Sequence, residues 1–515
     1  MKSALHAKTV VVAEKPSVAR DIARVLGADR RADGYLWGSG WAVTWAVGHL
    51  VELPQPHEIN PEWRRWRRDH LPLLPREWPL VVSDRTRDQF EVVRRLLLAP
   101  EIERVVCATD AGREGELIFR YIVEAAGCDK PVSRLWISSL TADAIKKGFA
   151  RLREGREMDP LADAARGRSR ADWLVGMNLS RAYSLDYDEE LSVGRVQTPT
   201  LAMVVERELA IRAFVPEDYL EVVATFAPIG AGEGAGLYRG TWFQGANPTP
   251  ESKRLYAPKE PERAGQDFVE AMKIVSRVKT GKAAVQSVRG ETKRMPAPLL
   301  YDLTELQRHA NRLWGWSAQK TLGVAQALYE QKKLLSYPRT DSRHLSQDVA
   351  ATLPEIVAAV RGPYEALLAP GTGETPLGRR FVDDSKVTDH HAILPTAVRA
   401  AGLDLSEDER RLYDLVCRRL LAAWHGDHVT AVTTVITAVS SPGEGVAGAP
   451  PIVDRFHSSG TAIEQVGWKV LDLPRRQKGK GKGKEKSGVA PADGVAGERR
   501  EAPGEDDAAD FPGKE

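Results

Sequence analysis

Two stretches of the chain repeat one order: a short apolar run, an acidic loop, and a helical pattern. The first apolar run, residues 9–13, predicts a buried strand and is followed by helical periodicity over 18–26. The second run, 104–108, leads into a Gly-rich acidic loop that begins at Asp110, after which helical periodicity resumes. Repeated strand–loop–helix units predict an α/β domain with a parallel sheet, whose chemistry collects at the carboxyl ends of the strands.

Three carboxylates follow these two strands. Glu14 comes after the first strand, and Asp110 and Glu114 come after the second. If the strands are neighbours, the three groups converge, and hard oxygen ligands of this kind suit Mg²⁺ shared with a substrate phosphate. Lys15 would then reach the same phosphate. The alternative interpretation is an aspartate and solvated glutamates at the start of a helix, where negative charge is common.

A tyrosine beside cations lies in the run Ser-Tyr-Pro-Arg-Thr-Asp at 336–341. The hydroxyl of Tyr337 is a weak nucleophile near pH 7, because a tyrosine has an ordinary pKa of about 10. It attacks phosphorus usefully where cations stabilise the phenolate and the transferring phosphoryl group. Arg339 can fork onto two phosphate oxygens, and Pro338 biases Tyr337 towards an extended conformation. The alternative is a proline-containing surface turn with solvated charges.

Two further segments carry polar groups suited to nucleic acid. His390 and His391 are adjacent, so they cannot point the same way on a regular element, and one is free to reach phosphate while the other packs. A zinc site is the rival interpretation, but no cysteine or spaced histidine supports it. The segment 192–197 reads as a tight turn that offers backbone N–H groups, Arg195 and Gln197 to a nucleic-acid backbone or base.

Length and composition set the outer limits. A chain of 515 residues predicts three or four domains, and no apolar run reaches the roughly 18 residues of a membrane span. Three scattered cysteines exclude a disulfide framework and a cysteine-type zinc ribbon. The N-terminal run is too short for a signal peptide, so we expect a cytoplasmic protein. Residues 475–515 are rich in Gly, Lys, Ala and acidic residues and predict a disordered tail.

The rest of the chain shows a coarse alternation of helical and strand-like blocks. We predict helical blocks at 160–215, interrupted at 192–197, and at 302–334 and 406–424; a β-rich block at 218–290; and strands at 428–439 and 461–472.

Taken together, six segments resemble the type IA DNA topoisomerases, most closely their bacterial topoisomerase III branch. The matching segments, in the order of the family, are 13–17, 108–118, 170–178, 192–197, 336–341 and 388–396. The resemblance implies an α/β Toprim domain over 1–155. It also implies a mixed α+β, multi-domain toroidal gate over 156–474, with the single-strand groove, a hinge and the catalytic tyrosine domain at about 290–400.

The resemblance also implies a reaction. Tyr337 would attack one DNA strand and hold its 5′ end as a phosphotyrosine, another strand would pass, and the freed 3′-hydroxyl would reverse the linkage. Such an enzyme depends on Mg²⁺, needs no ATP, relaxes negative supercoils and decatenates DNA. Implied partners are single-stranded or underwound DNA and a helicase or single-strand-binding protein; the family implies a monomer that associates with the nucleoid and no membrane.

Residue roles follow from the matching positions. Arg339 would stabilise the phosphoryl charge, Glu14 and Lys15 would assist proton transfer, and His390 would contact the phosphate. Mg²⁺ would be held by Glu14, Asp110 and Glu114. The residues implied in DNA binding are Arg168, Ser192, Val193, Gly194, Arg195, Val196, Gln197 and Arg339.

The chain departs from the family pattern in two places. The acidic motif of the family is Asp-x-Asp-x-Glu, but Gly112 holds the middle position here. One Mg²⁺ ligand is therefore missing, or replaced by water, Glu114 or Glu116, and we expect weaker metal affinity. A later segment of the family that returns through the gate is also absent, which implies a toroid incomplete at its C-terminal side. The alternative function is a truncated, catalytically impaired remnant that binds single-stranded DNA; a Toprim nuclease or primase ranks last, because it gives Tyr337 no role.

Overall fold

The structure is a computed structural model that describes residues 7–138, 140–229, 236–256, 266–443 and 450–473. The tail predicted to be disordered, 475–515, lies outside these residues. Among the helices of the described ranges, none combines the length and the apolarity of a membrane span.

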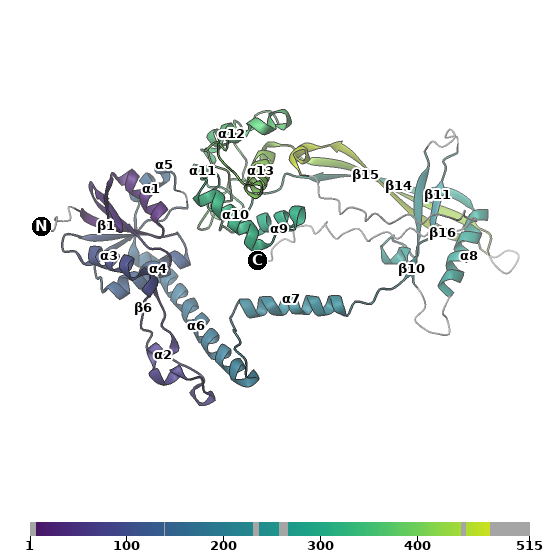
Figure 1. The fold of residues 1–515 in the computed structure, drawn as a ribbon. Coiled ribbons are helices and arrows are strands. Elements are labelled where there is room, and N and C mark those ends of the chain that lie inside the picture. Colours follow the sequence, from purple (N-terminus) through teal and green to yellow (C-terminus); the bar gives the residue numbers. More distant parts are fainter. Residues whose placement is uncertain (1–6, 139, 230–235, 257–265, 444–449, 474–515) are drawn as a thin grey trace. The chain divides into compact units, whose positions relative to one another are not determined.

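The N-terminal part of the chain is built on a seven-stranded sheet in the order β2-β3-β4-β1-β7-β8-β9 (Figure 1). Its strands are β1 (Ala7–Ala13), β2 (Arg30–Ala32), β3 (Tyr35–Gly38), β4 (Gly40–Trp45), β7 (Arg104–Ala108), β8 (Val132–Arg134) and β9 (Arg153–Glu154). β1 lies between β4 and β7 and runs parallel to both. The two apolar runs that the sequence analysis singled out are therefore neighbouring parallel strands.

Helices cover both faces of this sheet: α1 (Pro16–Leu26), α3 (Arg87–Leu98), α4 (Arg113–Ala126) and α5 (Ala142–Phe149). Val10 and Val12 of β1 belong to the core that contains side chains of α3 and α4, whereas Val11 and Ala13 belong to the core of α1 and α5. Successive side chains of a strand point to opposite faces, so a strand covered on both sides must be apolar throughout. This explains why the run is continuous rather than alternating.

A long helix, α6 (Asp159–Tyr187), is attached to an earlier segment of the chain by the motif at 170–178. The Asn178 side chain accepts from the Leu73 N–H at 2.5 Å and donates to the Leu73 carbonyl at 3.0 Å. Trp173 Nε1 donates to the carbonyl of Pro54 at 2.8 Å. The attached segment contains β5 (Val51–Glu52), β6 (Val81–Val82) and α2 (Pro56–Ile59). This motif therefore fixes the packing of α6.

Replacing Asn178 with leucine is expected to lower the free energy of unfolding by about 1–3 kcal/mol, because it leaves the buried backbone groups of Leu73 without partners. Urea unfolding followed by tryptophan fluorescence measures the change. Asp163→Ala, at an exposed position of the same helix, is the control and should stay within about 0.5 kcal/mol of the wild type. Equal effects of the two substitutions would contradict the assigned role.

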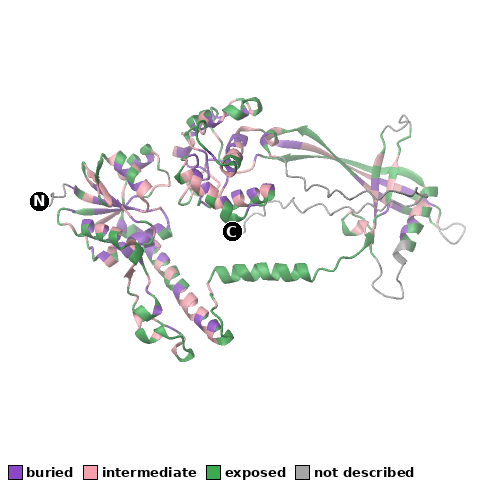
Figure 2. Cartoon of the chain, viewed as in Figure 1, coloured by how far each residue is buried: buried purple, intermediate pink, exposed green. Residues whose placement is uncertain are grey.

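The next helix, α7 (Gln197–Arg212), is exposed over its whole length (Figure 2). It leads to a five-stranded sheet in the order β11-β12-β16-β15-β14, whose recorded strand pairs are antiparallel. Its strands are β11 (Val223–Phe226), β12 (Tyr238–Phe243), β14 (Lys282–Met295), β15 (His428–Ser441) and β16 (Ile452–Gln465). Beside them lie the short pair β10 (Tyr219–Leu220) and β13 (Leu255–Tyr256), and α8 (Gln266–Thr280).

Two predictions of local structure were wrong in this region. The block 218–290 is not β-rich throughout, because it contains α8, whose Ile274 packs against Phe456 and Trp242 of the sheet. The strand expected at 461–472 is β16, which starts earlier and ends at Gln465. Val466 leaves the extended conformation with φ −67° and ψ −40°, Gly467 follows with a positive φ of 56°, and Gly467–Leu471 form a 3-10 helix.

The tyrosine segment lies among the helices α9 (Leu303–Trp314), α10 (Ala318–Glu330), α11 (Gln347–Ala350), α12 (Leu353–Val360) and α13 (Glu407–Leu421). α13 begins with the predicted capping box, in which Ser406 and Glu409 exchange side-chain-to-backbone hydrogen bonds. Within the described residues, the 3-10 helices are Pro61–Arg64, Arg68–His70, Asp84–Thr86, Gly155–Met158, Glu251–Lys253, Gly362–Leu367, Asp384–Lys386, Ala422–Trp424 and Gly467–Leu471.

Two irregular segments lie side by side here. The N–H of Ser336 donates to the carbonyl of Leu394 at 2.8 Å, and the N–H of Leu394 donates to Ser336 Oγ at 2.9 Å. Thr340 Oγ1 donates to the carbonyl of His390 at 3.0 Å. The motifs at 336–341 and 388–396, which are some 50 residues apart in the chain, are thereby held together.

Candidate active site

The carboxyl ends of β1 and β7 bring two carboxylates and a lysine into contact. The backbone N–H of Asp110 donates to Glu14 Oε2 at 3.1 Å. Lys15 Nζ lies 3.0 Å from Asp110 Oδ2 and 3.3 Å from Glu14 Oε1. The parallel register explains this contact, because Ala13 pairs with Ala108 and both strands end at the same edge.

Tyr337 contacts this cluster through the side chains of Lys15 and His390. Lys15 Nζ lies 4.2 Å from the centre of the Tyr337 ring, and the rings of Tyr337 and His390 are 4.4 Å apart. His390 Nε2 is 3.3 Å from Asp110 Oδ2. Asp110 therefore touches both side chains that contact the tyrosine, which joins the acidic loop to the tyrosine segment.

The charges of this cluster shift the acidity of its members in different directions. Burial opposes ionisation of Asp110, but the hydrogen bond from His390 and the charge of Lys15 hold the pKa of Asp110 well below its usual range. Burial alone would lower the pKa of Lys15. The negative charges of Asp110 and Glu14 have the larger effect, however, so the pKa of Lys15 is raised. Burial and the neighbouring Asp110 raise the pKa of Glu14. Lys15 is thus a cation at neutral pH, and Glu14 is the carboxyl group most suited to hold a proton.

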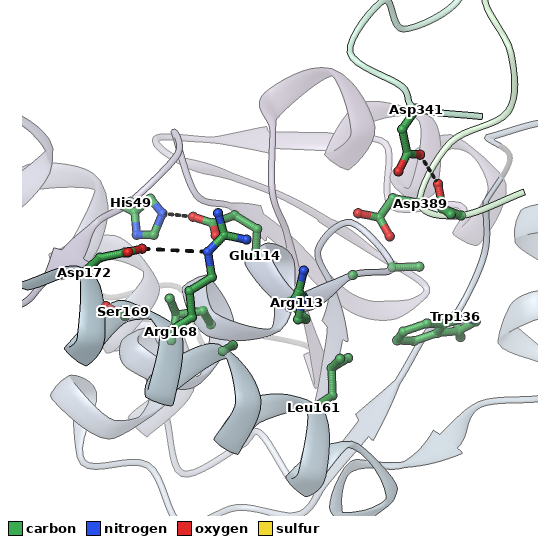
Figure 3. Close-up of a pocket in the computed structure, with 15 residues that line it drawn as sticks. His49, Arg113, Glu114, Trp136, Leu161, Arg168, Ser169, Asp172, Asp341 and Asp389 are labelled. Carbon is green, nitrogen blue, oxygen red and sulfur yellow. Dashed lines mark hydrogen bonds and ion pairs between the residues drawn. The ribbon is translucent and has the colours of Figure 1, made fainter. Parts of the chain in front are cut away.

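Glu114 does not join this pair of carboxylates. It lies 2.6 Å from His49 Nε2, whose hydrogen bond lowers the pKa of Glu114 despite partial burial (Figure 3). Among the residues that the structure describes, no group of three or more His, Cys, Asp or Glu side chains is arranged to hold a metal. The structure therefore brings together two of the three carboxylates expected to bind Mg²⁺ and directs the third to a histidine.

His49 was missed in the sequence analysis, although a signal was present. It follows β4, the other parallel neighbour of β1, so it lies at the same edge of the sheet. The same reasoning that selected Glu14 and Asp110 would have selected the loop after this strand.

The remaining donor set still fits a hard divalent cation. Two carboxylates in contact repel one another, which is one cause of the raised pKa of Glu14, and a cation between such groups removes that cost. Mg²⁺ often binds through one or two carboxylates and keeps several waters. Glu14 and Asp110 are therefore the residues that would hold it.

A pocket of about 620 Å³ opens beside the acidic loop (Figure 3). Arg168 and Asp172 of α6 line it together with Arg113, Asp341 and Asp389. The lining residues come from the acidic loop, from α6 and from the segments near the tyrosine. The pocket therefore lies beside the cluster and is lined by charged side chains together with apolar ones such as Trp136 and Leu161.

Of the residues expected to bind DNA, Arg168 lines this pocket, and Arg195 pairs with Asp172, which also lines it. Arg195 Nη1 pairs with Asp172 Oδ1 at 2.8 Å, and Arg168 Nε lies 3.7 Å from Asp172 Oδ2. Gln197 Nε2 donates to Ser192 Oγ at 2.9 Å. The other members of the turn are Val193, whose backbone bonds Ser180 Oγ, Gly194, and the exposed Val196.

Arg339 stands apart from these pairs. It is exposed two residues after Tyr337, and within the described part of the chain its guanidinium makes no hydrogen bond or ion pair. His391, the second histidine of the predicted pair, turns to the carbonyl of Ala392 at 2.7 Å, and burial lowers the pKa of His391. His390 alone therefore faces the cluster.

Comparisons with known proteins give a consistent family. The family model described as "DNA topoisomerase" matches residues 156–492, and the model described as "Toprim domain" matches residues 9–140. DNA topoisomerase 3 of Shouchella clausii is 42% identical over 431 residues, covering 83% of this chain and 56% of the relative. DNA topoisomerase 3 of Bacillus subtilis is 41% identical over 466 residues, covering 90% and 59%.

A solved structure shows the same fold. Full-length topoisomerase I from Thermotoga maritima aligns with a TM-score of 0.59 and 22% identity, covering 93% of this chain and 70% of that chain. At this identity the likeness concerns the fold alone. The chain spans a little under 60% of the length of the curated relatives named above.

Proposed function

The chain belongs to the type IA DNA topoisomerase family, and from that premise we propose that it cleaves and rejoins one DNA strand through Tyr337. The proposed enzyme is a bacterial topoisomerase III-like protein that depends on Mg²⁺, needs no ATP, relaxes negative supercoils and decatenates DNA. The observation that carries the proposal is the contact of Tyr337 with Lys15 and His390, both of which bind Asp110.

The proposed cleavage step is a transesterification. Tyr337 Oη attacks phosphorus, its proton leaves to water, and the bond from phosphorus to the 3′-oxygen breaks. Glu14 is proposed to protonate the departing 3′-oxygen in the state in which it holds no cation, where its pKa is raised. One phosphodiester is exchanged for another, so the reverse reaction needs no external energy.

Electrostatic stabilisation of the phosphoryl group is assigned to three side chains. Lys15 keeps its charge at neutral pH and lies against the Tyr337 ring, so it stabilises developing negative charge rather than accepting the proton. Arg339 is exposed beside the tyrosine and is proposed to fork onto non-bridging oxygens. His390 is proposed to contact the phosphate while it remains bonded to Asp110.

The cation and the DNA are assigned to neighbouring surfaces. Mg²⁺ bound to Glu14 and Asp110 would supply additional positive charge for the DNA phosphates. Glu114, the third expected Mg²⁺ ligand, is proposed to bind the cation only in a state in which its hydrogen bond with His49 is broken. Arg168 and the turn 192–197 are proposed to hold single-stranded or underwound DNA along the pocket of Figure 3.

We also propose that the chain comprises a Toprim domain over 1–155 and gate domains over 156–474. The protein is proposed to be a monomer associated with the nucleoid that cooperates with a helicase or single-strand-binding protein.

An end-labelled oligonucleotide tests the reaction. The protein is incubated with Mg²⁺ and single-stranded DNA labelled at either end, and SDS then traps covalent species on a gel. We expect the 3′ label to migrate with the protein and the 5′ label to appear in a shortened free strand, because the tyrosine holds the 5′ phosphate at the break. A 5′ label bound to protein would refute the proposed polarity. DNA binding without an adduct would favour the alternative, a binding remnant.

A further inference from the structure

Gly112 stands where the family has its second acidic residue. The backbone conformation at this position does not require a glycine. Its φ of −160° and ψ of 179° are extended values that any residue adopts. The constraint is space: a Cβ added to Gly112 would lie 2.2 Å from Asp389 Oδ2 and 2.5 Å from Asp389 Cγ and Oδ1. Ordinary contacts of a Cβ begin near 3.4 Å. The Asp389 carboxylate therefore occupies the volume into which a side chain at 112 would project.

The Asp389 carboxylate is also close to the acidic cluster and uncommitted. Within the described residues, the Asp389 carboxylate makes no hydrogen bond or ion pair. Asp389 lines the pocket drawn in Figure 3 and also a smaller one that contains Asp110 and His390.

The two glutamates considered as substitutes for the missing carboxylate are engaged elsewhere. Glu114 is bonded to His49. Glu116 is only 1% exposed and forms ion pairs with Arg120 at 2.8 Å and with Arg134 at 3.3 Å. Breaking a buried pair of this kind is costly, so Glu116 is not available to a cation in the pocket.

We propose that Asp389 supplies the carboxylate that Gly112 lacks. Among the described residues, Glu14, Asp110 and Asp389 are not already arranged as a metal site, so a divalent cation bound to Glu14 and Asp110 would draw the Asp389 carboxylate of the tyrosine segment towards them. The inference rests on the proposed function, because that function requires the cation. It replaces the expectation of a site that simply lacks one ligand. It also implies that cation affinity depends on contact between the acidic loop and the segment beside Tyr337.

Cation binding by the full-length chain, measured without DNA, tests the proposal. Isothermal titration with Mg²⁺ is expected to show a dissociation constant raised about 10- to 100-fold in Asp389→Ala, the range found when a residue that supports a metal site is lost. Asp129→Ala, at an exposed aspartate outside the pocket, is the matched control and should bind like the wild type. An unchanged constant in Asp389→Ala, or no Mg²⁺ binding by the wild type, would overturn the proposal.

A reciprocal exchange guards against a general loss of folding. Gly112→Asp alone must displace Asp389, so we expect a lower melting temperature for it than for the wild type. Gly112→Asp combined with Asp389→Ala should regain both the melting temperature and the Mg²⁺ affinity. Failure of the double variant to bind Mg²⁺ better than Asp389→Ala would contradict the exchange of roles.

The two proposals can fail separately. If Mg²⁺ binding depends on Asp389 but no DNA adduct forms, the proposed reaction is wrong and the proposed cation site stands. If an adduct forms but the Asp389→Ala substitution leaves Mg²⁺ affinity unchanged, the cation site is wrong and the reaction stands.

Discussion

The Tyr337→Phe variant is expected to form no covalent adduct with DNA at any Mg²⁺ concentration. The substitution removes only the hydroxyl, because the phenylalanine ring can keep the contacts with Lys15, His390 and Tyr329. Adduct formation should therefore fall below detection on the SDS gel, while the affinity for a fluorescent single-stranded oligonucleotide, measured by anisotropy, stays within about twofold of the wild type.

Tyr329 provides the matched control. Its ring lies 5.4 Å from that of Tyr337, and burial raises the pKa of Tyr329 although Lys15 opposes the shift. Tyr329→Phe should therefore retain adduct formation. If the adduct instead survived in Tyr337→Phe and vanished in Tyr329→Phe, the nucleophile would be reassigned and the role of the motif at 336–341 would be wrong.

Local patterns in the sequence were sufficient for the elements that carry the site. Continuous apolar runs identified β1 and β7, because parallel strands buried on both faces are apolar along their whole length. The helical patterns after these runs identified α1 and α4. The family resemblance was confirmed by the matches to both family models. The placement of Glu14 beside Asp110 followed from these strands alone.

Contacts between distant segments could not be predicted in this way. His49 reaches Glu114 across 65 residues, and Asp389 fills the space beside Gly112 from a segment almost 280 residues away. Neither contact leaves a periodic signal, since each depends on how separate loops pack. The sequence alone shows that Gly112 carries no carboxylate, and it does not show that Asp389 lies in the space beside it.

The role of Lys15 depends on three contacts made by one ammonium group. It lies 3.3 Å from Glu14, 3.0 Å from Asp110, and 4.2 Å from the centre of the Tyr337 ring. Removing its charge leaves two adjacent carboxylates without their shared cation and leaves the phenolate without its nearest positive charge. Both changes raise the barrier to attack on phosphorus, the first by adding negative charge near the phosphate and the second by destabilising the nucleophile.

Lys15→Met is therefore expected to slow single-turnover cleavage by about 10²- to 10³-fold, comparable to the loss of one donor that stabilises transition-state charge. Methionine keeps a similar length and apolar stem, so DNA affinity should change little. The rate is measured with excess protein and a 3′-labelled oligonucleotide. Lys15→Arg retains the charge in a different geometry, so its cleavage rate should lie between those of the wild type and Lys15→Met. A Lys15→Met rate within threefold of the wild type would mean that the charge is needed only to hold Glu14 and Asp110 together in the fold, and the assignment of Lys15 to the phosphoryl group would have to be withdrawn.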